Sequence, residues 1–130
     1  MLIGEKQCKW AAWYQTHFKY VSTESTYDEV AHKIKHTALR DRILADLRGR
    51  ECWVNVEHKV FIEGNRTNLS GKIDLIACKG ERGIIFELKS GKPYPTDKAQ
   101  LMLYMWALRR AYRRFQHVLF DGRVVIQTKK

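Results

Sequence analysis

Two acids and a lysine lie inside apolar stretches, where charge is costly. Asp74 lies within residues 71–76, and Glu87 and Lys89 lie within residues 84–89. A carboxylate in such a segment needs compensation, and a divalent cation is the natural partner of two facing carboxylates. A lysine two residues beyond the second acid can hold a water molecule or stabilise developing negative charge. The trio therefore predicts a cation site with a lysine beside it.

Both stretches have the composition of neighbouring β-strands. They are rich in Ile, Leu and Phe, and the short glycine-bearing segment 79–83 between them is typical of a hairpin connection. Because side chains alternate along a strand, we expect Asp74 to share a face with Ile76 and Cys78, and Glu87 to share one with Ile85 and Lys89. The same rule groups the remaining residues on the opposite faces: Ile73, Leu75 and Ala77 on the first strand, and Ile84, Phe86 and Leu88 on the second.

A helix is predicted after these strands, from Thr96 as N-cap to about Phe115. Gln100 and Tyr104 are four residues apart, so they share one face of it. Both can hydrogen-bond a phosphate or a water molecule, although Tyr104 as core and Gln100 as polar surface is the alternative. Two prolines and a glycine exclude regular structure from residues 90–95.

This series of motifs resembles the PD-(D/E)XK nuclease superfamily. Asp74, Glu87-x-Lys89 and Gln100-x-x-x-Tyr104 occur in the order that the RecB-like branch shows, which includes the Cas4 exonucleases. The resemblance implies an α/β restriction-endonuclease-like fold with a mixed central sheet flanked by helices. It also implies that these five residues are catalytic. An ordinary surface hairpin with a salt bridge is the alternative interpretation.

The resemblance further implies Mg²⁺ or Mn²⁺, held by Asp74, Glu87, the Leu88 carbonyl and a histidine of the preceding helix. We choose His36, because Ala38 and Leu39 follow it as small and apolar residues follow the histidine of the family. His32 is the rival candidate. A helix-surface or core histidine is the alternative for either.

The predicted function is metal-dependent DNA cleavage. Among relatives, exonuclease action on single-stranded or end-exposed DNA is the commoner role. A structure-selective endonuclease similar to junction resolvases, usually a dimer, and a non-catalytic DNA-binding module on the same fold are the alternatives. No helicase motif occurs, so a helicase would have to be a separate partner chain, as would a CRISPR or repair protein. Association of the chain into a homo-oligomer is a further possibility.

The charge agrees with a polyanionic partner. Lys and Arg outnumber Asp and Glu by 24 to 14, and the net charge is +10. Lys92 and Tyr94, in the loop after the second strand, are candidates to guide the nucleic acid. Arg109 and Arg113 belong to a basic edge of the predicted helix that would contact DNA backbone or be a solvated helix end.

The length of 130 residues suggests a single domain, residues 1–130. No apolar run has the length of a membrane span or a signal peptide. We therefore expect a cytoplasmic protein without a membrane partner, in the host cytoplasm if the source is viral.

Three cysteines occur, at Cys8, Cys52 and Cys78. Cas4-like relatives hold an iron–sulfur cluster with one cysteine near the N-terminus and three near the C-terminus. Cys8 resembles the first of these, but no cysteine follows Cys78. Four thiolates are the usual requirement, so we predict no cluster and expect Cys8 to be a small buried hydrophobe.

The remaining segments predict two helices, a strand and a hairpin. A helix over residues 4–20 precedes a long one from about Tyr27 to Arg48, capped by Ser25 or Thr26 and ending at Gly49. The long helix carries apolar residues on two faces, so we expect two packing partners. A strand is predicted over residues 53–63, with Glu57 facing solvent. Asp121-Gly122 predicts a hairpin between strands 117–120 and 123–127.

Overall fold

The computed structural model describes residues 9–19, 21 and 28–127 of the chain. The elements in order are α1 (Lys9–His17), α2 (Glu29–Arg48), β1 (Trp53–Glu63), β2 (Asn68–Lys79), β3 (Arg82–Lys89), α3 (Pro95–Ala111), the short 3₁₀ helix η1 (Arg113–Phe115) and β4 (Leu119–Ile126).

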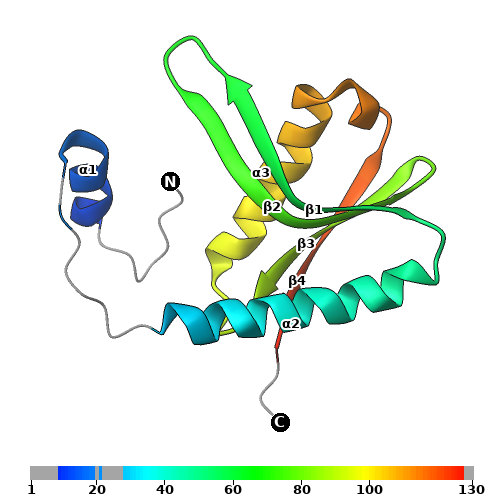
Figure 1. The fold of residues 1–130 in the computed structure, drawn as a ribbon. Helices are drawn as coiled ribbons and strands as arrows, with labels where there is room; N and C mark the ends of the chain where they lie inside the picture. The colour runs from blue at the N-terminus through cyan, green and yellow to red at the C-terminus, as the bar shows by residue number, and fades with distance from the viewer. Residues whose placement is uncertain (1–8, 20, 22–27, 128–130) are drawn as a thin grey trace.

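The four strands form one mixed sheet in the order β1-β2-β3-β4. The β1–β2 and β2–β3 pairs are antiparallel, whereas β3 and β4 are parallel. Helix α2 crosses one face of the sheet and α3 covers the other (Figure 1). This arrangement confirms the predicted α/β fold of a mixed central sheet flanked by helices.

Each face of the sheet has its own apolar cluster. On one face, side chains of α3 such as Leu101, Ala107 and Leu108 pack on Ile76 and Ile85. The cluster on the other face combines residues of α2 with residues of β2 and β3: Leu39, Leu47, Leu75, Ala77, Phe86 and Leu88. The two acids of interest therefore lie on strands that are covered from both sides.

The alternation along β2 is interrupted beside Asp74. Ile73 packs in the α3-side cluster together with Ile76, and Leu75 packs on the α2 side. The expected grouping of Ile73 with Leu75 and Ala77 is therefore wrong. The interruption coincides with one in β1, where Glu57 has φ +53° and no pair is formed between Val56↔Leu75 and His58↔Ile73. Glu57 is exposed, as predicted.

The C-terminal hairpin prediction is wrong, because residues 119–126 form one continuous strand. This strand pairs along β3, with Ile85 opposite Gly122 and Lys89 opposite Ile126. Gly122 serves helix packing instead of a turn, since a Cβ there would lie 3.2 Å from the Cβ of Leu101 in α3. The local turn signal is overridden by pairing that is distant in sequence.

The predicted bounds of α3 also need correction. The helix begins at Pro95, inside the segment predicted as irregular, and its N-cap is Tyr94 instead of Thr96. Proline suits the first helical position because the missing N–H has no partner there anyway. The helix ends at Ala111, where Tyr112 is extended (φ −129°, ψ 120°). Arg113 consequently lies on η1 and not on a helical face shared with Arg109.

Helix α2 ends at Gly49, as predicted, and begins at Glu29 with Asp28 as N-cap. Asp28 Oδ1 accepts a hydrogen bond from the Ala31 N–H at 2.9 Å. Val30 and Ile34 are 69% and 64% exposed. Among the described residues, the expectation that α2 packs on a second partner is therefore wrong. The proposed caps Ser25 and Thr26 lie outside the described residues, as do Tyr27 and Cys8.

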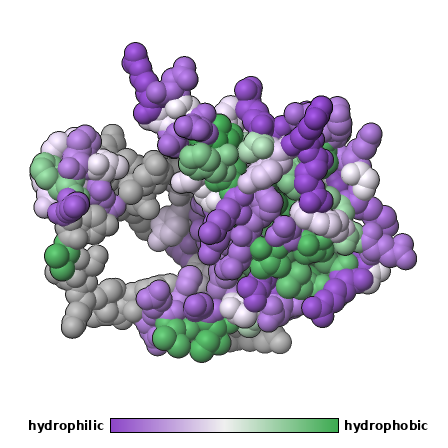
Figure 2. All heavy atoms as spheres, turned by 45° about the horizontal axis from the view of Figure 1, so that its top comes forward, coloured by the Kyte–Doolittle hydropathy of each residue, from purple (hydrophilic) through white to green (hydrophobic). Residues whose placement is uncertain are grey.

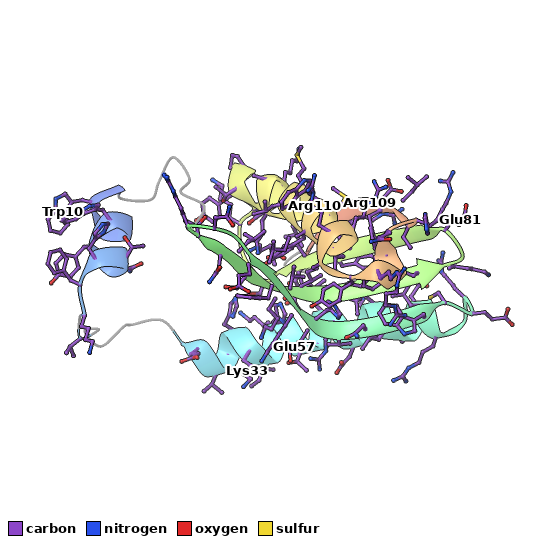
Figure 3. The ribbon with its side chains drawn as sticks, turned by 90° about the horizontal axis from the view of Figure 1, so that it is seen from above. Trp10, Lys33, Glu57, Glu81, Arg109 and Arg110 are labelled. Carbon is purple, nitrogen blue, oxygen red and sulfur yellow. The ribbon has the colours of Figure 1, made fainter. Side chains whose placement is uncertain are left out.

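The described part of the first helix spans Lys9–His17 and lies apart from the sheet (Figures 1 and 3). Hydrophilic side chains cover most of the face drawn in Figure 2, with smaller apolar patches between them. Among the described residues, no helix is long and apolar enough to cross a membrane.

Candidate active site

Asp74 lies where β2 and β3 stop pairing. The β2–β3 register ends at Leu75↔Phe86, and one residue further the Asp74 Oδ2 accepts a hydrogen bond from the Leu88 N–H at 2.8 Å. A side-chain oxygen therefore satisfies an amide beyond the last strand pair. The Asp74 side chain is 15% exposed, so the carboxylate lies at the edge of the core with access to solvent.

His36 of α2 reaches the same carboxylate. Its Nε2 lies 3.4 Å from Asp74 Oδ2, and its side chain is 25% exposed. His32 lies one helical turn earlier, with its ring centroid 6.2 Å from that of His36. The structure thus brings His36 to Asp74, whereas His32 is exposed and lines a neighbouring groove.

Glu87 and Lys89 form an ion pair that extends to α3. Lys89 Nζ lies 3.0 Å from Glu87 Oε1 and 3.2 Å from Asp97 Oδ1. Glu87 and Asp97 are 6% and 4% exposed. The other oxygen of Asp97, Oδ2, accepts a hydrogen bond from the Tyr94 N–H at 2.8 Å. The lysine is therefore held between a strand carboxylate and a helix carboxylate.

Burial and neighbouring charge shift two pKa values here. The pKa of Glu87 is raised, first by burial and then by the negative charge of Asp74, and Lys89 offsets this only in part. Burial alone would lower the pKa of Lys89, but its hydrogen bonds and charge attraction to Glu87 and Asp97 raise it instead. The site therefore holds an excess of negative charge that an additional cation would relieve.

Gln100 and Tyr104 are joined to each other and to β2. The Gln100 Nε2 donates to the Tyr104 hydroxyl at 2.9 Å, and that hydroxyl donates to the Lys72 carbonyl at 3.3 Å. Tyr104 is 8% exposed, and a Cβ on Gly71 would lie only 2.5 Å from its ring. Tyr104 therefore belongs to the core and fixes α3 against the strand that carries Asp74.

A groove of about 490 Å³ opens beside Lys89, between the start of α2 and the loop before α3. Its lining includes the predicted Lys92 and Tyr94, and also His32 and Lys35 of α2. Lysines lie on both walls of the groove, Asp28 also belongs to its lining, and Tyr94 is 48% exposed. These are features of a surface that binds a nucleic-acid strand.

The sequence comparison with protein families gives the same assignment. The family description "PD-(D/E)XK nuclease superfamily" matches residues 5–129. The chain belongs to this superfamily. Membership indicates a nuclease, that is, a phosphodiesterase acting on DNA, and a divalent metal is typical of the superfamily. A search of curated proteins found no match.

The donor types of this PD-(D/E)XK site fit such a metal. Asp74, Glu87 and the Leu88 carbonyl supply oxygen, which Mg²⁺ and Mn²⁺ prefer. Burial, and then the negative charge of Asp74, raise the pKa of Glu87, and a bound cation would favour its ionised form. Within the described residues, however, no three side chains of His, Cys, Asp or Glu are grouped closely enough to hold an ion. The set His36, Asp74, Glu87 and Leu88 stays a prediction.

Two predicted nucleic-acid contacts lie away from the candidate site. Arg109 donates to the Gln116 carbonyl at 3.3 and 3.4 Å, near the C-terminal end of α3, where Figure 3 shows it beside Arg110. Arg113 lies on the following 3₁₀ helix η1. The structure does not bring either residue to the Asp74–Lys89 region.

Sequence reasoning missed the contact between Asp97 and Lys89. Asp97 lies in the first turn of α3, a position that acids favour for electrostatic reasons. Its place three residues after the N-cap Tyr94 is typical of a capping box. That spacing predicts the bond to the Tyr94 N–H, but the contact with Lys89 depends on how α3 docks on β3.

Proposed function

We propose that the chain is a metal-dependent deoxyribonuclease of the RecB-like, Cas4-like branch, acting as an exonuclease on single-stranded or end-exposed DNA. One observation carries the proposal. Asp74 lies at the point where β2 and β3 separate, beside the Glu87–Lys89 pair and a groove with lysines on both walls. Acids, a lysine and a polyanion-binding surface in one place fit phosphodiester hydrolysis.

Asp74, Glu87, His36 and the Leu88 carbonyl would hold Mg²⁺ or Mn²⁺. When bound, the cation supplies positive charge at the scissile phosphate and a water molecule of lowered pKa. Lys89 orients the attacking water or stabilises the negative charge that develops on the phosphate oxygens. The near-complete burial of Glu87 beside Asp74 supports its role, because acids whose pKa is shifted by burial and a neighbouring charge cluster at functional sites.

The groove supports a single strand as substrate. Lys35 and Lys92 lie on opposite walls and can contact phosphates, and the exposed ring of Tyr94 can stack on a base. Gln100, half-buried and held by Tyr104, positions the nucleic acid at the start of α3. Arg109 and Arg113 contact DNA outside the groove, at the other end of that helix.

The test is cleavage of end-labelled linear and circular DNA, single- and double-stranded, with Mn²⁺, Mg²⁺ or EDTA. Metal-dependent loss of linear DNA that Asp74→Ala and Lys89→Ala both abolish would support the nuclease. Survival of circles would support an exonuclease, and their cleavage would favour the structure-selective endonuclease. Intact DNA with every metal, together with retained DNA binding, would refute the activity and leave a non-catalytic binding module.

A further inference from the structure

Lys89 is held from two different elements of the fold. The Glu87 carboxylate lies two residues away on the same strand, at 3.0 Å, whereas the Asp97 carboxylate reaches it from α3 at 3.2 Å. The Lys89 side chain is 30% exposed, and that of Asp97 is 6% exposed. The ammonium group therefore lies at the edge of the groove while its partner on α3 is enclosed.

Both oxygens of Asp97 are engaged. Oδ1 faces Lys89 and Oδ2 accepts the N–H of Tyr94, so rotation of the carboxylate would break one contact or both. The position at the start of a helix also favours its negative charge. Asp97 thus provides a charged group in one fixed orientation, tied to the residue that begins α3.

We infer that Asp97 is a positioning residue for the proposed hydrolysis: it fixes the Lys89 ammonium in the site and couples it to the groove wall at Tyr94. A lysine side chain has a flexible four-carbon stem and loses substantial rotamer freedom when it is held. Because Glu87 is assigned to the cation, the carboxylate of Asp97, which has no other assigned role, keeps Lys89 in place. For its kinetic consequence this inference rests on the proposed nuclease function.

The competing explanation is that Asp97 only caps α3. Two variants distinguish this explanation from a role in positioning Lys89. Asp97→Asn and Asp97→Ser each keep an oxygen that can accept the Tyr94 N–H, but neither has a negative charge for Lys89. Asp46→Asn is a matched control. It removes a carboxylate from an exposed ion pair with Arg50, near the far end of α2. Thermal unfolding of all variants verifies that they are folded at the assay temperature.

The first measurement needs no enzymatic activity. The folded protein is acylated with an amine-specific reagent, and mass spectrometry gives the modification rate of each lysine. We expect Lys89 to react severalfold faster in the Asp97 variants, because the freed amine is more mobile, while the exposed Lys92 serves as internal reference. The Asp46→Asn protein should match the wild type. An unchanged Lys89 rate in whichever Asp97 variant folds would overturn the inference.

The second measurement is steady-state cleavage of single-stranded DNA. We expect kcat to fall about tenfold to a hundredfold in the Asp97 variants, with little change in KM, as for other groups that orient a site residue. Asp97→Glu, which restores the charge, should recover part of the rate. Equal kcat in wild type and Asp97→Asn would overturn the inference. Absence of cleavage by the wild type would instead refute the proposed function, and the acylation result would still decide the role of Asp97.

Discussion

On the α3 side of the sheet, the candidate site is a series of short contacts between two buried acids and a partly exposed lysine. Glu87, Lys89 and Asp97 are joined at 3.0 and 3.2 Å, and Asp97 is bonded in turn to the start of the helix. On the α2 side, His36 reaches Asp74 at 3.4 Å, next to an open groove. The protein itself fixes the Lys89 ammonium on the α3 side, whereas the open groove next to the α2 side offers a surface for a DNA strand. We therefore expect the α3 side to set the rate and the α2 side to set binding.

The largest expected effect separates two lysines that are three residues apart. Lys89→Ala should lower kcat by a factor of about 10² to 10³, the cost of removing a group that stabilises transition-state charge. Added Mn²⁺ should not restore the rate. Lys92, on the groove wall, should act on binding instead: Lys92→Ala should weaken DNA binding and make the affinity less dependent on salt. The measurement is a DNA titration at several salt concentrations. If the two variants had the same kinetic profile, the division between the sides would fail.

The rigidity of the α3 side can be tested at Gly71. A Cβ at this position would lie 2.5 Å from the Tyr104 ring, so we expect Gly71→Ala to lower the free energy of unfolding by about 1–3 kcal/mol, measured by denaturant titration. Gly49→Ala is the matched control, because nothing lies within 4 Å of a Cβ there. Its backbone (φ −78°, ψ −2°) also suits alanine. Equal stability of the two variants would mean that Tyr104 is not fixed against β2.

The α2 side predicts a defect that added metal can repair. His36→Ala should raise the Mn²⁺ concentration needed for half-maximal cleavage about tenfold, the lower end of the cost of disturbing a metal site, with the maximal rate largely retained. His32→Ala, one turn earlier on the same helix, serves as control and should leave the metal dependence unchanged. If His36→Ala lost maximal rate and saturating metal did not restore it, His36 would belong with the residues of the α3 side that are expected to set the rate.

The smallest effect concerns the pH dependence of stability. Because the pKa of Glu87 is higher in the folded chain than its ordinary value of 4.5, its contribution to stability is full below that pH. The contribution is lost as pH rises through the folded pKa. We therefore expect Glu87→Gln to gain stability relative to wild type between acid and neutral pH. The measurement is the difference in unfolding free energy between the two proteins from pH 4 to 7. A difference that is constant with pH would contradict the shift.

Most of the sheet could be predicted from local patterns, since an alternating segment such as residues 53–63 matches β1 from end to end. The misses arise where distant contacts override local signals. Gly122 was assigned to a turn, but it makes room for Leu101 of α3. Ile73 changes sides at the level of the sheet where Glu57, on the neighbouring strand, has a positive φ.

For the candidate site, strand spacing predicted that Lys89 would lie beside Glu87, and the resemblance to the nuclease superfamily indicated His36, which is far from Asp74 in the chain. The structure brings His36 to Asp74 and holds Lys89 against Glu87. Asp97 was missed because its contact with Lys89 depends on the docking of α3, which no spacing encodes. Arg113 was misplaced because the helix ends before it, at an extended Tyr112.

The parallel pairing of β4 has a consequence for the order of events during synthesis. Until residues 119–126 have emerged from the ribosome, β3 has a neighbour on one side only, and the strand bearing Glu87 and Lys89 is the exposed margin of a three-stranded meander. The last strand must then return across α3 to close a long loop. The hydrogen bond just after this strand, from the Gln127 N–H to the Lys89 carbonyl at 3.0 Å, holds the backbone of the lysine in the sheet. A nascent chain lacking this strand is therefore expected to be unable to cut nucleic acid.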